Sequence, residues 1–109
     1  MPFDVFLTED AARDLEDLYQ YIAVHDAPKK AEQVLNKFEK IFGSLSDYPE
    51  RGVYPKELLA LGIRNYREIF YKPYRVIYRV VGDAVYILLI ADGRRDMQTV
   101  LQQRLLTAD

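Results

Sequence analysis

The chain has 109 residues, of which 50% are hydrophobic and 13% are aromatic. These values suit one globular domain spanning residues 1–109, and they exclude disorder as the main state. The absence of cysteine excludes disulfides, thiolate nucleophiles and thiolate metal sites. No apolar run approaches the roughly 20 residues that cross a bilayer, and the start lacks the pattern of a signal peptide. We therefore expect a cytoplasmic protein without membrane contact.

The charge is distributed unevenly along the chain. The net charge of −2 combines eleven acidic and five basic side chains in residues 1–50 with six acidic and ten basic side chains in residues 51–109. A basic second half can meet an anionic partner, whereas the overall balance argues against strong non-specific binding of nucleic acid. The alternative interpretation is that the two halves neutralise each other within the fold.

The first half of the chain predicts a short strand followed by two helices. Residues 3–7 alternate between apolar and polar side chains, and Thr8 suits a helix N-cap. An apolar stripe at helical spacing continues to Ile22, and Pro28 suits the first turn of a second amphipathic helix that runs to about Leu45. Because the join is short, we expect an antiparallel helix hairpin.

The second half predicts a loop and then a sheet. Residues 46–62 are rich in proline and glycine and predict a loop, within which residues 55–61 can add a helical turn. Residues 63–71, 74–81 and 84–91 then favour three consecutive strands, the last of them central, and a short helix closes the chain. The expected fold class is α+β: an N-terminal strand, an antiparallel helix hairpin packed on one sheet face, a three-stranded antiparallel meander and a short C-terminal helix.

The ordered set of motifs resembles the ParE/RelE superfamily of small bacterial toxins. The likeness includes a Tyr-Arg-x-x-Tyr strand and a Gly-Arg-Arg-Asp close, and it rests on residues 11–22, Ala31 and residues 49–52, 62–64, 74–80, 85–90 and 93–96. The resemblance implies the toxin component of a type II toxin–antitoxin system. RelE-like members cleave messenger RNA on the ribosome and ParE-like members poison DNA gyrase, so the fold cannot choose between the two activities.

The residues needed for RNA cleavage are incomplete when they are matched to the RelE-like pattern. Arg75 and Arg95 fall on arginine positions of the family, but the position of its tyrosine is Leu101, which can neither donate nor accept a proton. The only lysine between residues 52 and 71 is Lys56, and Glu68 places an anion on the first strand of the meander. These departures favour the ParE-like branch.

No other catalytic or metal-binding constellation is present in the sequence. The single histidine, His25, lies at the join of the two helices, where we interpret it as solvated or capping. No metal-ligand spacing of the His-Glu-x-x-His kind occurs. We therefore expect no catalytic residue, no metal and no cofactor.

The principal hypothesis is a ParE-like toxin that inhibits DNA gyrase, is neutralised by a ParD-like antitoxin and makes no direct sequence-specific contact with nucleic acid. One alternative is a RelE-like ribosome-dependent mRNA endoribonuclease. The other is an inactive toxin-fold protein that serves as a partner in an antitoxin repressor complex. The candidate target-binding residues are the arginines of the meander and of the segment after it: Arg64, Arg67, Arg75, Arg79, Arg94 and Arg95. The alternative interpretation of these arginines is a solvated sheet face with local ion pairs.

The candidate antitoxin-binding surface is the apolar stripe of the helix hairpin, together with one open sheet edge. An unfolded, acidic antitoxin tail can fold onto such a groove or add a strand to such an edge. We expect a stable complex in the form of a heterotetramer built on an antitoxin dimer. The residues predicted for this contact are Leu15, Leu18, Ile22, Val34, Phe38 and Ile41.

Overall fold

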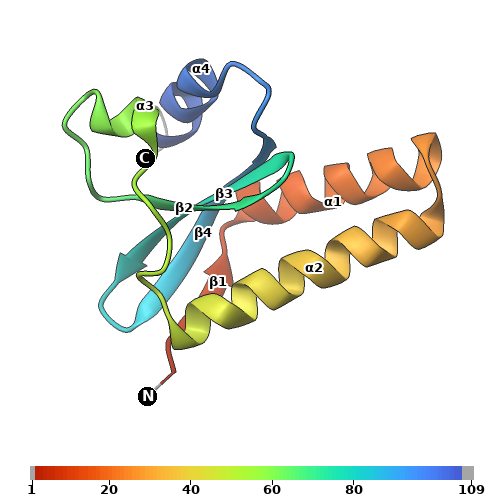
Figure 1. The fold of residues 1–109 in the computed structure, drawn as a ribbon, viewed down its shortest axis with the longest axis horizontal. Coiled ribbons are helices and arrows are strands. Elements are labelled where there is room, and N and C mark those ends of the chain that lie inside the picture. Colours follow the sequence, from red (N-terminus) through yellow and green to blue (C-terminus); the bar gives the residue numbers. More distant parts are fainter. Residues whose placement is uncertain (1, 107–109) are drawn as a thin grey trace.

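The computed structural model describes residues 2–106 and confirms the α+β class (Figure 1). The sheet has the order β1-β4-β3-β2, in which β1 is parallel to β4 and the other neighbours are antiparallel. The elements are β1 (Asp4–Leu7), α1 (Glu9–His25), α2 (Pro28–Asp47), α3 (Lys56–Leu59), β2 (Arg67–Tyr71), β3 (Tyr74–Val81), β4 (Ala84–Asp92), α4 (Met97–Leu101) and a closing π-helical turn, Gln102–Leu106.

The two long helices form the expected hairpin, and local signals set their ends. The Thr8 hydroxyl accepts a hydrogen bond from the Ala11 N–H at 3.2 Å, which satisfies one of the free amides at the start of α1. Pro28 stands at the start of α2, where a helix needs no N–H. The hairpin covers one face of the sheet (Figure 1).

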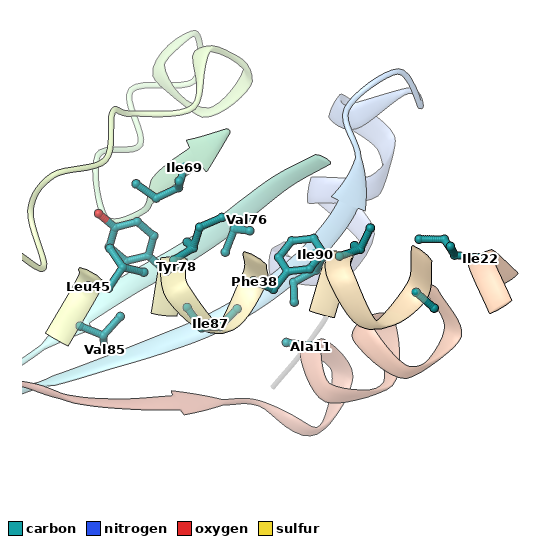
Figure 2. Close-up of a cluster of buried hydrophobic side chains, with 13 residues drawn as sticks. Ala11, Ile22, Phe38, Leu45, Ile69, Val76, Tyr78, Val85, Ile87 and Ile90 are labelled. Carbon is teal, nitrogen blue, oxygen red and sulfur yellow. The ribbon is translucent and has the colours of Figure 1, made fainter. Parts of the chain in front are cut away.

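The main core lies between the helix hairpin and the sheet (Figure 2). Phe38 of α2 is fully buried, and its ring meets the rings of Tyr71 and Tyr74 at centroid distances of 5.2 and 5.6 Å. Val76 and Tyr78 of β3 pack into the same cluster. Burial of these apolar side chains is the main favourable term for folding the hairpin onto the sheet.

A second, smaller core covers part of the opposite sheet face. Ile77 and Leu89 pack there against Leu58 of α3 and Leu101 of α4. A β-bulge allows β4 to serve both cores: Ile77 is opposite Leu89 and Tyr78 is opposite Ile87, so Leu88 is the extra residue between them. The prediction that this strand is central is confirmed, and the two cores cover both of its faces over part of its length.

One predicted boundary is wrong. The strand expected from residue 63 begins only at Arg67, and Arg64 lies in the preceding loop. The reason is the helical turn α3: the Ile63 N–H donates to the Leu58 carbonyl at 2.9 Å, and Ile63 packs on the second core. These contacts draw residues 63–66 away from the sheet.

The segment before α3 closes against the sheet edge through a glycine. Val53 and Glu68 exchange two backbone hydrogen bonds of 3.1 and 2.7 Å, and the Gly52 N–H donates to the Tyr78 hydroxyl at 2.9 Å. A Cβ on Gly52 would lie 2.6 Å from that hydroxyl and 2.7 Å from the Glu68 carbonyl oxygen. Only glycine fits this close approach.

None of the helices in residues 2–106 has the length and apolar character needed to cross a membrane.

Candidate functional site

A concavity of about 730 Å³ opens beside the edge of β2, on the face that carries the second core. Its apolar wall includes Val53 and Phe70, which are 56% and 61% exposed. Lys56, Lys72 and Arg94 add positive charge. Apolar side chains surrounded by cations form a surface suited to a protein partner rather than to a small polar substrate.

A buried ion-pair cluster lies next to this concavity. The Arg75 guanidinium donates from Nε to Glu68 Oε1 at 2.6 Å and from Nη1 and Nη2 to the two carboxylate oxygens of Glu57 at 2.8 and 2.7 Å. Arg75 and Glu68 are 5% and 3% exposed. The hydrogen bonds from Arg75 hold the pKa of Glu57 below its ordinary value, whereas burial raises the pKa of Glu68. The hydrogen bonds of Glu57 also raise the pKa of Arg75.

This cluster changes the interpretation of Arg75. The sequence offered it as an exposed target-binding residue, but the structure places it inside the protein with both carboxylates already bound. Its charge is therefore compensated before any partner arrives. Releasing it would leave the buried Glu68 and the partly buried Glu57 without their cation, which is costly.

The two arginines after β4 have different environments. Arg94 is 77% exposed on its side chain and forms a two-pronged pair with Asp92, with contacts of 2.9 Å from Nε and 2.6 Å from Nη2. This pair lowers the pKa of the Asp92 carboxyl. Arg95 is exposed, and its guanidinium makes no ion pair within residues 2–106. Both side chains are accessible to a partner at the end of the concavity that Arg94 lines.

Neither Leu101 nor His25, the two positions considered for proton transfer in the sequence, lines the large concavity. Leu101 is 1% exposed and belongs to the second core. His25 stacks on Tyr21 at 4.1 Å at the end of α1, and its Nδ1 lies 3.0 Å from the Tyr21 carbonyl oxygen. Within the described part of the chain, no group of three or more His, Cys, Asp or Glu residues could hold a metal ion.

The remaining three candidate arginines meet at another place. Arg64, Arg67 and Arg79 line a smaller concavity of about 250 Å³, together with Glu50, Asn65 and Val80. Arg64 comes from the loop before β2, whereas the other two stand near the ends of β2 and β3. The structure thus divides the six candidate arginines into one buried residue, one pair after β4 and one group of three.

The helix hairpin offers a narrower surface than the sequence suggested. Four of the six predicted antitoxin contacts face the sheet and form the core: Ile22, Val34, Phe38 and Ile41. Leu15 and Leu18 are only partly buried. Leu15 lines an apolar groove of about 320 Å³ between β1, α1 and α2, and the other lining residues are Leu7, Ala12, Glu16, Tyr19 and Leu35.

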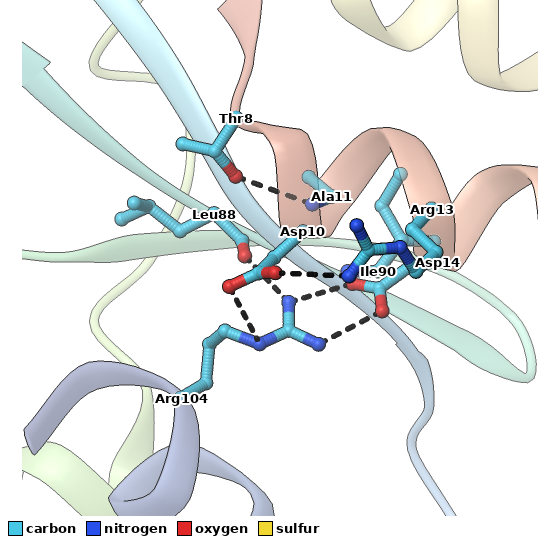
Figure 3. Close-up of polar contacts among 8 residues, drawn as sticks. All are labelled: Thr8, Asp10, Ala11, Arg13, Asp14, Leu88, Ile90 and Arg104. Atoms are coloured by element: carbon cyan, nitrogen blue, oxygen red, sulfur yellow. Dashed lines mark hydrogen bonds and ion pairs between the residues drawn. The ribbon is translucent and has the colours of Figure 1, made fainter. Parts of the chain in front are cut away.

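A polar clamp that the sequence did not reveal fastens the C-terminal segment to α1 (Figure 3). Both oxygens of Asp14 accept hydrogen bonds of 2.8 Å from the Arg104 guanidinium, and Asp14 also accepts from the Ile90 N–H at 3.0 Å. Arg104 donates to the carbonyl of the bulged Leu88 at 2.8 Å. The clamp therefore satisfies backbone groups that the end of β1 and the bulge leave unpaired.

Comparison with known proteins identifies this architecture. A chain in a solved structure described as the chromosomal ParDE toxin–antitoxin system from P. aeruginosa has a TM-score of 0.69 at 24% identity, covering 83% of this chain and 95% of that one. A chain in the toxin–antitoxin complex RelBE2 from Mycobacterium tuberculosis has a TM-score of 0.58 at 27% identity, covering 84% and 92%. The fold is thus that of the ParE/RelE superfamily.

The sequence comparisons define the family more closely. The family model described as ParE toxin of type II toxin–antitoxin system, parDE, matches residues 5–97. Toxin ParE3 from Caulobacter vibrioides is 31% identical over 100 residues, which are 92% of this chain and 96% of that protein. This chain belongs to the ParE toxin family of type II toxin–antitoxin systems. The predicted ParE-like branch is confirmed.

Proposed function

We propose that the protein inhibits DNA gyrase by binding it, without being an enzyme itself, and that a ParD-like antitoxin silences it. The observation that carries this proposal is the neutralised state of the site where the RelE-like relatives place catalytic groups. Arg75 is bound by two carboxylates, and Leu101 lies in the core. A phosphate would meet neither a free cation at the first position nor a proton donor at the second.

The concavity supports binding to a protein target. Interfaces draw most of their energy from a few apolar and arginine side chains that are surrounded by polar groups. Phe70 and Val53 supply exposed apolar surface, and Arg94 borders the same concavity. Gyrase acts on the chromosome, so we place the action of the toxin in the cytoplasm.

The helix hairpin supports neutralisation by an antitoxin. The groove lined by Leu15 and Tyr19 exposes mainly apolar surface and lies outside the core. A disordered tail that folds into it would bury that surface, as amphipathic helices do in grooves. An antitoxin dimer that carries two such tails would assemble with two toxins into a heterotetramer.

A supercoiling assay with purified gyrase, ATP and relaxed plasmid tests the proposed activity. The wild-type toxin should inhibit supercoiling, and the double variant Arg94→Ala/Arg95→Ala should need about tenfold more protein or more for equal inhibition. The matched control is Arg13→Ala, an exposed arginine on α1 whose side chain is 68% accessible. Full inhibition by the double variant would show that these arginines do not contribute to binding gyrase. Cleavage of messenger RNA at the ribosomal A site in a purified translation system would replace the proposal with the ribonuclease alternative.

A second experiment tests the antitoxin surface. Leu15→Lys should weaken antitoxin binding by about tenfold or more, because it places a charge in the apolar groove. Val24→Lys is the control, since Val24 is 75% exposed near the end of α1. Circular dichroism verifies that both variants fold. Equal affinities of the two folded variants would show that the antitoxin binds elsewhere.

A further inference from the structure

The three arginines of the smaller concavity gather at one place and have no carboxylate partner within residues 2–106. Within residues 2–106, ion pairs engage Arg13, Arg75, Arg94 and Arg104. None engages the group that we name the arginine patch: Arg64, Arg67 and Arg79. The nearby Glu50 lines the concavity but lies beyond ion-pair distance of these side chains. Uncompensated guanidinium groups gathered at one place favour an anion there.

Two members of the patch are held in position by neutral contacts. Arg67 donates to the Gly52 carbonyl at 2.9 Å and stacks on Tyr54, with its guanidinium carbon 4.7 Å from the ring centroid. The Arg79 guanidinium lies 6.0 Å from the ring centroid of Tyr66. These contacts order the side chains without cancelling their charge, so less entropy is lost when an anion binds.

The end of the sheet adds backbone groups to the patch. The first pair between β2 and β3 is Arg67 with Tyr78, so β3 extends beyond β2 and no strand residue lies opposite Val80. Val81 is opposite Ala84 across the two-residue turn, and such a pair is hydrogen-bonded in an antiparallel hairpin. Because hydrogen-bonded and non-hydrogen-bonded pairs alternate, we infer that the N–H of Val80 points away from β4, toward the open side. Phosphate oxygens accept hydrogen bonds from backbone amides and from guanidinium groups, and both kinds of donor are present here.

The polar lining favours nucleic acid over a peptide as the occupant. Apart from Val80, the residues around this concavity are charged or polar, so a peptide would find no apolar anchor. Interfaces with DNA are polar and strongly positive, and arginine forks bind phosphate in two-pronged fashion. The volume of about 250 Å³ suits one backbone phosphate with its water.

The position of the patch links it to the proposed gyrase site. Arg67 reaches the carbonyls of Glu50 and Gly52 and the hydroxyl of Tyr54. Tyr54 lines the large concavity, whereas Glu50 lines the small one, so the two sites lie on either side of the segment 50–54. A toxin that binds gyrase through the large concavity would bring the arginine patch close to the DNA that gyrase holds.

We propose that the arginine patch binds the phosphodiester backbone of gyrase-bound DNA without reading its sequence. The inference rests on the proposed function, because gyrase supplies the DNA. It is compatible with the acidic net charge of the chain, since three local contacts provide only a modest affinity. The toxin would then recognise the enzyme–DNA complex as one composite target.

The test is fluorescence anisotropy with a 20-base-pair duplex between 25 and 200 mM NaCl. The logarithm of the wild-type affinity should fall with the logarithm of the salt concentration, and Arg64→Gln/Arg79→Gln should reduce that slope by about two. Arg67 is left unchanged because it also bonds to carbonyl groups. The control, Arg13→Gln/Lys29→Gln, removes the same charge from exposed positions of the helix hairpin and should keep the wild-type slope.

Other outcomes would overturn the proposal. Equal slopes for the two double variants, or no DNA binding by the wild type at 25 mM NaCl, would show that the patch does not bind DNA. Saturation of the patch by inorganic phosphate, with no binding of the duplex, would make it a site for a small anion. Loss of antitoxin affinity in Arg64→Gln/Arg79→Gln, with an unchanged DNA slope, would assign the patch to a protein.

Gyrase assays separate this inference from the proposed function. Gyrase free of DNA should bind the wild type and Arg64→Gln/Arg79→Gln equally, and the gyrase–DNA complex should bind the variant about tenfold or more weakly. If gyrase is not inhibited but the salt slopes differ as expected, the proposed function fails and the patch remains a DNA site. If inhibition persists and the slopes do not differ, the patch inference fails alone.

Discussion

Replacing Asp14 with alanine should destabilise the fold far more than the same change at Asp10, one turn earlier on α1. The Asp14 side chain is 18% exposed and accepts two hydrogen bonds from Arg104 and one from the Ile90 N–H. Hydrogen bonds to a charged group contribute about 1.5–3 kcal/mol, and an amide left without an acceptor costs about 1–3 kcal/mol. Since solvent reaches part of the pair, we expect Asp14→Ala to lower the free energy of unfolding by about 2–4 kcal/mol.

Asp10 is the matched control. Its side chain is 51% exposed, and its contacts with Arg13 and Arg104 are 3.7 and 3.9 Å long. Asp10→Ala should therefore cost less than about 1 kcal/mol, including the loss of a negative charge near the helix N-terminus.

Urea unfolding of Asp14→Ala, Arg104→Ala and the double variant completes a cycle that isolates the pair. We expect a coupling free energy of about 1–2 kcal/mol between the two side chains. A coupling below about 0.5 kcal/mol, or equal losses for Asp14→Ala and Asp10→Ala, would refute the view that this clamp holds the C-terminal segment.

Three further predictions concern the core, the close backbone approach and the buried ion pairs. Phe38→Ala should lower the free energy of unfolding by about 3–5 kcal/mol in urea, because its ring is fully buried, whereas Tyr21→Ala at a 61% exposed position should cost less than about 1 kcal/mol. A smaller effect at Phe38 would mean that the core is looser than described. Gly52→Ala should be destabilising by more than about 1 kcal/mol, because its Cβ would overlap a tyrosine hydroxyl, while Gly43→Ala in α2 meets no atom within 4 Å and should gain about 0.5–1 kcal/mol in thermal unfolding. The same sign for both glycines would contradict the argument. The pKa of Glu57 is lowered in the fold, so its contribution is present above the ordinary carboxyl value of 4.5 and is lost as pH falls through the folded value. Urea midpoints between pH 3 and 6 should therefore fall less steeply on acidification in Glu57→Gln than in the wild type, and parallel profiles would show that this carboxylate is not the group involved.

The parts of the fold that the sequence predicts are those with local causes. The N-cap at Thr8, the first-turn Pro28 and the turn at Gly82, where φ is +61°, each act on their immediate neighbours. The helix hairpin and the β3–β4 hairpin follow from them. The parallel pairing of β1 with β4 joins residues about 80 positions apart and has no such local signal.

The candidate site was less predictable, because it depends on contacts between distant elements. The sequence placed Arg75 on a strand, but strand periodicity does not predict that α3 brings the Glu57 carboxylate to this side chain. One signal was available: Glu57 and Glu68 are the only acidic residues between positions 51 and 82, in an otherwise basic segment. Isolated acids of this kind are candidates for buried pairs with arginine.

Hydrophobic periodicity predicted the buried face of the helix hairpin but not the surface that is accessible to an antitoxin. The apolar stripe identified the face of α2 that packs on the sheet, and burial of Val34 and Phe38 leaves neither free for a partner. The accessible groove also uses residues outside the stripe, such as Ala12 and Glu16. Similarly, Asp14 and Arg104 are 90 positions apart, so only the folded chain brings them together.

We propose that this ParE-family toxin acts on gyrase and is controlled by its antitoxin. The most direct measurement is the fraction of plasmid that gyrase leaves cleaved in the presence of ATP after rapid denaturation and proteolysis. If the proposal is right, the toxin raises the cleaved fraction, and prior addition of the antitoxin abolishes the increase. An unchanged cleaved fraction with undiminished supercoiling, at toxin concentrations that arrest growth when expressed in cells, would contradict it.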